Sequence, residues 1–297
     1  MRDGLRHLYA DYDMFLRPVM KFILAFASLF LIQQYLGFQE QLSSPAILAA
    51  ASVICMFFPF GFISVIGACF VLANVYEVSL MMTFFMLILF LLIGVLYYGF
   101  RPGTGLILLL VPIAFILKLP FLVPIVLGLC SGIFSAIPAA LGVIVWFSIR
   151  YAAQHFADST SAKLSSDMLS EFMTISNGVF KDKYMLLILF SFVLCILIVH
   201  LISHLSIDHA WTISVVAGII VLAFLMVLGG AYYGSESFAG DIISLVISFL
   251  LGLGYEMLFY CVDYHSTEHL QFEDDDYFYY VKAVPKIRPY DDDDRRE

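Results

Sequence analysis

The stretch "PFLVPIVLGLC" occupies residues 120–130, and the stretch "PFGFISVIGAC" occupies residues 59–69. Both carry Pro-Phe, then a glycine and a cysteine, at the same relative places and at one fixed offset along the chain. Each proline interrupts a long apolar run, and a proline inside a helix removes a backbone hydrogen bond and breaks or kinks the helix. The two stretches therefore predict two broken helices in corresponding positions.

Composition indicates that these broken helices lie in a membrane. Of the 297 residues, 62% are hydrophobic and 13% are charged, and the mean hydropathy is +0.95. Soluble domains carry about 25% charged residues. Several apolar runs reach or approach the roughly 20 residues that span a bilayer; they are 79–100, 183–203, 210–233 and 242–262. The sequence predicts an all-α, polytopic transmembrane helical bundle with about 8 to 10 membrane segments.

The order of apolar and polar stretches predicts five regions. They are a cytoplasmic N-terminal segment (1–19), an N-terminal transmembrane region (20–153), an extracytoplasmic amphipathic segment (154–182), a C-terminal three-helix transmembrane region (183–262) and a cytoplasmic acidic and aromatic tail (263–297). In the amphipathic segment, apolar residues at helical spacing favour a helix on the membrane surface; they are Leu164, Met168, Phe172 and Ile175.

The distribution of basic residues predicts the orientation. Each broken segment crosses the membrane twice or not at all, so both termini are expected on one side. That side holds most of the 15 lysines and arginines. Cytoplasmic loops carry an excess of Lys and Arg. We therefore expect a plasma-membrane protein with both termini in the cytoplasm.

The two broken stretches also suggest an internal repeat. One unit spans 46–100 and the other 107–153, and each reads as two short helices followed by a full span. Each unit makes an odd number of crossings, so adjacent units are expected to be inverted. Inverted repeats with broken helices are typical of transporter binding sites. The alternatives are chance matching in apolar sequence and a repeat that only builds the fold.

Polar residues within the apolar regions are candidates for binding a substrate or ion, because charges in a membrane are costly. The candidates are Lys118, Glu256, Glu77 and Asn74, together with the breaks at Pro59 and Pro120. Glu256 is the strongest candidate for ion coupling, the alternative being a structural hydrogen bond. Lys118 is alternatively a lysine that extends to the interface, and Glu77 and Asn74 are alternatively interfacial. Asp241 is expected to begin the last helix, where the helix dipole stabilises a carboxylate.

Histidines near the ends of two helices suggest a possible metal site. His200, His204 and Asp208 follow one another at helical spacing, and His265 and His269 recur after the last helix. Two histidines four residues apart lie on one helix face and can share a metal ion. A site made from His204, Asp208, His265 and His269 is one interpretation, and interfacial histidines are the other.

Motifs for an enzyme are absent from the sequence. It contains no G-x-S-x-G, no H-E-x-x-H and no glycine-rich phosphate loop. We therefore expect no enzymatic activity, no cofactor and no nucleic-acid partner. Without a nucleotide-binding motif, any ATP-driven process would require a separate ATPase subunit. Gly128-x-x-x-Gly132 is expected to allow close packing of helices.

The tail combines acidic residues with aromatic ones. Phe272, Tyr277, Tyr279 and Tyr280 are candidates for binding the sheet edge of a partner protein, and a solvated, disordered tail is the alternative. The run "VDYHSTEHLQFEDDDYFYYVKAVPK" resembles the ending of a group of uncharacterised polytopic membrane proteins of Gram-positive bacteria. The resemblance implies a bacterial plasma membrane and no particular activity.

Two functions are consistent with these features. The paired breaks favour a transporter or permease that moves a small substrate at a site where the breaks converge. The low number of charges in the membrane favours a scaffold that recruits cytoplasmic or envelope partners through its tail.

Overall fold

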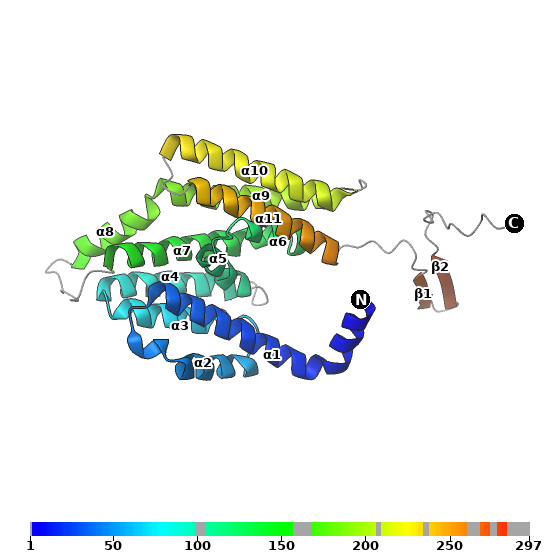
Figure 1. Ribbon diagram of the computed structural model, residues 1–297, viewed down its shortest axis with the longest axis horizontal. Helices are drawn as coiled ribbons and strands as arrows, with labels where there is room; N and C mark the ends of the chain where they lie inside the picture. Colours follow the sequence, from blue (N-terminus) through cyan, green and yellow to red (C-terminus); the bar gives the residue numbers. More distant parts are fainter. Residues whose placement is uncertain are drawn as a thin grey trace. The chain divides into compact units, whose positions relative to one another are not determined.

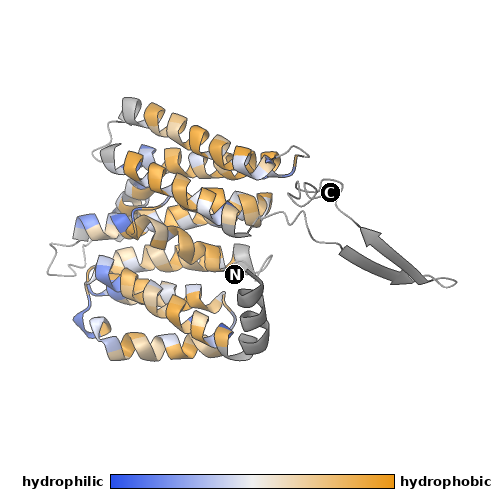
Figure 2. Ribbon diagram, turned by 45° about the vertical axis from the view of Figure 1, so that its right-hand side comes forward, coloured by the Kyte–Doolittle hydropathy of each residue, from blue (hydrophilic) through white to orange (hydrophobic). Residues whose placement is uncertain are grey.

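The computed structural model describes residues 2–98, 105–156, 168–205, 209–233, 238–259, 268–273 and 278–283. The chain divides into two units, Met1–Leu253 and Gly254–Glu297. The first unit is built from helices that lie roughly side by side (Figure 1). Hydrophobic residues dominate these helices along most of their length (Figure 2).

The N-terminal third of the first unit contains the first predicted break. Its elements are α1 (Arg2–Leu36), the short 3-10 helix η1 (Glu40–Ser43), α2 (Pro45–Phe57), α3 (Phe62–Tyr76) and α4 (Leu80–Tyr98). Pro45 occupies the first turn of α2, where its missing N–H costs no helical hydrogen bond. The chain leaves the helical conformation at Phe58, directly before Pro59. The predicted break at Pro59 is confirmed.

The second predicted break follows in the same way. Its elements are α5 (Leu106–Ile116), α6 (Leu122–Cys130), the 3-10 helix η3 (Ile133–Ser135) and α7 (Ala136–Phe156). Residues 117–121 separate α5 from α6, so the predicted break at Lys118–Pro120 is confirmed. At about 1.5 Å per residue, α5 and α6 are each roughly 13 to 17 Å long. Each is too short to cross a hydrocarbon core of about 30 Å alone.

The remaining helices of the chain are α8 (Met168–Phe180), α9 (Lys183–Ser203), α10 (Ala210–Tyr233) and α11 (Phe238–Phe259). Within the described residues, five helical stretches are long and apolar enough to cross a membrane. They are Leu16–Leu36, Ile133–His155, Lys183–Ser203, Ala210–Gly229 and Gly240–Met257. These helices are compatible with an integral membrane protein.

Helix α8 lies in the segment for which the sequence predicts an amphipathic surface helix. Ile175 and Val179 are buried. The ring of Phe172 lies 5.9 Å from that of Phe85 on α4, and a Cβ atom at Gly178 would collide with the ring of Tyr151 on α7. The helix therefore packs against α4 and α7 with its apolar side. Leu164, the first residue of the predicted apolar face, lies outside the described residues.

The second unit contains a feature that the all-helical expectation missed. Strands β1 (Glu268–Glu273) and β2 (Phe278–Ala283) form an antiparallel hairpin. Phe272 lies opposite Tyr279, and Gln271 lies opposite Tyr280. Three of the aromatic residues proposed to bind a partner's sheet, Phe272, Tyr279 and Tyr280, thus lie in strands that pair within their own chain. The all-helical prediction holds for the described apolar segments and is wrong for this part of the tail.

Candidate substrate pathway

The first broken segment is a hairpin that enters the bundle from the end where α1 finishes. Leu29 of α1 packs against both Leu48, in the first turn of α2, and Phe70, in the second half of α3. The start of α2 and the later part of α3 therefore lie at one level, and the chain turns back between them. The turn itself lies beside Lys21, two turns before Leu29 on α1.

Lys21 holds the tip of this first hairpin. Its Nζ donates a hydrogen bond of 2.9 Å to the carbonyl of Phe58, at the end of α2, and lies 5.2 Å from the centre of the Phe60 ring. A helix end leaves carbonyl groups without intrahelical donors, and a cation near a helix C-terminus is stabilising. Lys21 thus stabilises the break from a neighbouring helix.

Lys21→Met is expected to lower the free energy of unfolding by about 1 kcal/mol, because the hydrogen bond is partly exposed. Methionine keeps most of the apolar stem and removes only the ammonium group. Lys181→Met, at an exposed cation outside both breaks, is the matched control and should change stability by less than about 0.5 kcal/mol. Denaturant unfolding in micelles measures both. Equal effects of the two substitutions would show that Lys21 does not hold the tip.

The second hairpin enters from the opposite end, where α7 begins. A Cβ atom at Gly142 of α7 would lie 2.7 Å from Val111 of α5, and the Phe115 ring stacks 5.2 Å from that of Trp146. Helix α5 therefore runs parallel to α7 and stops level with Trp146, close to the midpoint of α7. Phe115 also lies 6.0 Å from Phe192, near the midpoint of α9. The tip of this hairpin thus lies in the middle of the bundle.

The tip has a defined backbone geometry. Lys118 has a φ of 58°, the left-handed region that L-residues other than glycine seldom adopt. The N–H of Lys118 donates to the carbonyl of Phe115, and the N–H of Leu119 donates to that of Ala114. This is the Schellman pattern of a helix C-terminus. Lys118 and Leu117 are exposed, whereas Pro120 and Phe121 are buried.

Polar side chains lie beyond this tip, toward the end of α7. Arg150 follows Trp146 by one helical turn, and its guanidinium interacts electrostatically with Tyr35 of α1, Tyr184 of α9 and Asp241 of α11. The Tyr184 hydroxyl donates a hydrogen bond of 3.2 Å to Asp241 Oδ2. A half-buried cation, a carboxylate and phenol groups from four helices therefore lie near one another at this level.

The start of α9 fixes Tyr184 in this cluster. The carboxylate of Asp182 accepts a hydrogen bond of 2.9 Å from the Tyr184 N–H and caps the helix. Asp241 lies in the first turn of α11, the position at which a carboxylate favours the helix dipole. Its bond to Tyr184 adds a contact between α11 and α9 that its sequence position did not indicate.

The structure does not bring the two breaks together. The hairpins meet along α3 and α5, where a Cβ atom at Gly67 would lie 2.7 Å from Leu109. Pro59 precedes Gly67, whereas Pro120 follows Leu109, and the two helices run in the same direction. The helix ends beside the two breaks, Phe62 of α3 and Ile116 of α5, therefore lie roughly 18 Å apart along the bundle. A single site formed by the converging breaks is not what the packing produces.

Asn74 and Glu77 belong to a network that fastens the loop between α1 and α2. The Asn74 side chain is completely buried and donates a hydrogen bond of 2.8 Å to Gln33 Oε1. Its own Oδ1 accepts from the backbone N–H of Gln39 at 3.3 Å. The Gln33 amide in turn donates to the Gln39 carbonyl and to the Ser43 hydroxyl. Glu77 is exposed and accepts from the Gln39 side chain.

The other candidate residues lie at the end of α9, in the second unit or outside the described residues. Glu256 is half-buried in the part of α11 that belongs to the second unit. His204 is exposed at the end of α9, with its ring 4.1 Å from that of His200. His269 lies in β1. Asp208, His265 and Tyr277 lie outside the described residues, so the metal site stays untested; the part of the chain that the structure describes contains no group of three possible ligands.

Sequence reasoning missed four residues that the structure makes important. They are Lys21, Gln33, Arg150 and Tyr184. Gln33 and Arg150 lie near the ends of apolar runs, where polar residues are usually taken as interfacial. A buried partner on another helix distinguishes a structural polar residue from an interfacial one, and only the packing shows that partner.

Comparison with known proteins adds no relative. No protein-family model, no curated protein and no solved structure matches the chain.

Proposed function

We propose that this protein is a transporter-like or permease-like integral membrane protein, without enzymatic activity, that moves a small substrate across the plasma membrane. One observation carries the proposal: two helical hairpins enter the bundle from opposite ends, and the second turns back in its middle. Broken helices of this kind are the usual sequence and structural marker of a transport site. The opposed directions also support an inverted relation between residues 46–100 and 107–153, which superposition about an in-plane two-fold axis would test.

The second tip is the point at which a substrate would be handled. Backbone that is not helical is tolerated at membrane depth only where protein buries it or where it lines a water-filled cavity. At the first tip, the Phe58 carbonyl has Lys21 as its donor. At the second tip, Lys118 and Leu117 are exposed. The cluster that contains Arg150 and Asp241 lies beyond this tip, toward the end of α7. These groups support a polar path from the α8 end of the bundle to its middle.

The sequence supports a membrane orientation and an energy source for the proposed transport. We propose that both termini lie in the cytoplasm, as the basic residues favour, so the polar cluster faces outward. Transport is coupled to an ion or to a separate ATPase subunit, because the chain has no nucleotide-binding motif.

A cysteine at position 118 tests the proposal. In a chain whose native cysteines are replaced, Lys118→Cys should react with a small, membrane-impermeant cationic thiol reagent added outside intact cells. A thiol reacts as thiolate, which water stabilises and lipid does not. Phe224→Cys, on the exposed apolar face of α10, is the matched control and should stay unmodified. Reaction at position 118 no faster than at position 224 would contradict the aqueous path.

A scaffold is the second candidate, and the tail hairpin favours it. The register pairs Leu270 with Val281 and Phe272 with Tyr279 along a two-stranded antiparallel ribbon. A single two-stranded hairpin is marginally stable in water, and its free edges are templates for a partner's strand. An unreactive cysteine at position 118 would leave this as the better supported function.

A further inference from the structure

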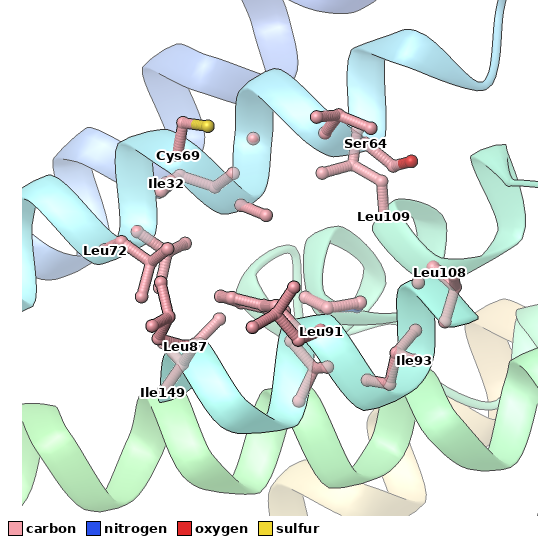
Figure 3. A pocket seen from close by; sticks show the side chains of 18 residues that line it. Ile32, Ser64, Cys69, Leu72, Leu87, Leu91, Ile93, Leu108, Leu109 and Ile149 are labelled. Atoms are coloured by element: carbon pink, nitrogen blue, oxygen red, sulfur yellow. The ribbon is translucent and has the colours of Figure 1, made fainter. Parts of the chain in front are cut away.

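An apolar cavity of about 300 Å³ lies between α3, α4 and α5, and no member of the polar cluster lines it. Figure 3 shows the side chains of Leu72, Leu87, Leu91 and Leu109 arranged around the open space. Ile32 of α1 and two residues of α7 complete the wall. The two hairpins thus each contribute one helix to the cavity, α3 and α5.

The wall offers almost no group that a polar ligand would need. Among the described residues that line it, the polar side-chain groups are the Ser64 hydroxyl and the Cys69 thiol. Ser64 already donates a hydrogen bond of 2.6 Å to the Gly61 carbonyl. A polar molecule would lose its hydrogen bonds to water without replacing them. Apolar cavities of this kind stay dry and bind apolar ligands.

Small residues create the space. A Cβ atom built at Gly94 of α4 meets no other atom within 4 Å, although this glycine lines the cavity. At Gly67 of α3, by contrast, a Cβ atom would collide with Leu109. The tight contact at Gly67 holds α3 against α5, and the missing side chain at Gly94 leaves the cavity open beside it.

The cavity is reached from the side of the bundle. Val65, Leu87 and Leu91 line it and are also exposed, with 38%, 41% and 61% of their surface accessible. In a helical membrane protein, exposed apolar side chains of this kind face lipid. The opening between α3 and α4 therefore leads to the bilayer interior, and the molecule that meets it there is a hydrocarbon chain.

We propose that this cavity binds a single alkyl chain of a lipid, which enters from the bilayer between α3 and α4. A water molecule takes about 30 Å³ in the liquid and a methylene group about as much, so the cavity has room for about ten methylenes, which is one chain and not two. Because α3 and α5 belong to opposed hairpins, a chain held there contacts both. The inference adds a second site to the molecule, separate from the second tip, and does not depend on the proposed transport function.

Photo-crosslinking tests the binding. The full chain is reconstituted in phosphatidylcholine vesicles that contain a small fraction of a phosphatidylcholine with a diazirine in the middle of one acyl chain. A parallel sample carries the same diazirine on a free fatty acid, which separates a membrane lipid from a free chain as the source. After irradiation, peptides covering 64–72 and 87–94 should be labelled to saturation. Peptides around Ile220 and Phe224, on an exposed apolar face, should be labelled in proportion to probe concentration.

Gly94→Phe provides the decisive variant, because the ring fills the cavity without meeting backbone at its Cβ. Saturable labelling of the α3 and α4 peptides should be lost, while labelling around Phe224 persists. Gly254→Phe, at a glycine of α11 that also has open space and does not line the cavity, should change neither. If Gly94→Phe fails to fold, unlabelled dodecanoate is added to the wild-type chain instead. It should reduce the saturable labelling of the α3 and α4 peptides and leave the labelling around Phe224 unchanged.

Labelling of the cavity peptides that does not saturate, is not competed, or persists in a folded Gly94→Phe protein would overturn the inference. The readout does not require transport. Cavity labelling beside an unreactive cysteine at position 118 would therefore remove the transport proposal and leave the chain-binding site in place. A reactive position 118 beside unlabelled cavity peptides would do the opposite.

Discussion

Asn74→Leu is expected to lower the free energy of unfolding by about 3 kcal/mol. The side chain is fully buried, so its substitution leaves Gln33 Oε1 and the Gln39 N–H without their partners. Each buried polar group that loses its hydrogen bond costs about 1 to 3 kcal/mol. Leucine has a similar volume, so a cavity contributes little to the loss. Unfolding in mixed micelles, followed by the fluorescence of Trp146 and Trp211, measures the change.

Glu77→Gln is the matched control for Asn74, because Glu77 contacts the same loop from an exposed position. Glutamine keeps an oxygen acceptor for Gln39, and the expected change is below about 0.5 kcal/mol. A stable Asn74→Leu protein with impaired function would return Asn74 to the set of substrate-binding residues. The expected outcome instead assigns it to holding α1, η1 and α3 together.

Gly128→Ala is expected to destabilise the protein by about 2 kcal/mol, within the usual range for overpacking a core. A Cβ atom there would lie 2.8 Å from Val199 Cβ and 3.2 Å from the Ile196 carbonyl oxygen. The carbonyl belongs to the backbone of α9 and cannot rotate away. Helix α6 would have to move off α9, and the second hairpin tip would move with it. Unfolding measurements and the reactivity of a cysteine at position 118 should change together.

Gly94→Ala is the control for this substitution, since it adds the same methyl group where nothing lies within 4 Å. Alanine is also the better helix former by up to about 1 kcal/mol, so stability should hold or rise slightly. Similar losses at Gly94 and Gly128 would show that the close approach of α6 and α9 is not what requires a glycine.

Much of the local structure was predictable from the sequence, because it depends on neighbouring residues. Proline at positions 59 and 120 interrupts apolar runs, and both breaks lie where the sequence placed them. The long apolar runs became helices, since an apolar segment of that length in a bilayer must satisfy its backbone internally. The close helix packing expected at Gly128 is present. Gly132 has a φ of 76° and begins the turn into η3.

The tail hairpin and the apolar cavity could not be predicted from neighbouring residues alone. The pairing of β1 with β2 depends on a turn between two short segments that look equally like a solvated tail. The cavity depends on Gly94 of α4 and Leu109 of α5 lying around one space, which a one-dimensional pattern cannot indicate.

By itself, the sequence determined the described apolar helices and the two breaks, since hydrophobicity and proline act on a residue and its neighbours. Only the tertiary structure decided where in space those breaks lie relative to each other. It separated Pro59 from Pro120, buried Asn74 against Gln33 and grouped Arg150, Tyr184 and Asp241 beyond the second tip. The reason is that each of these arrangements depends on contacts between helices far apart in the chain, and many different pairings of apolar helices satisfy the same local pattern.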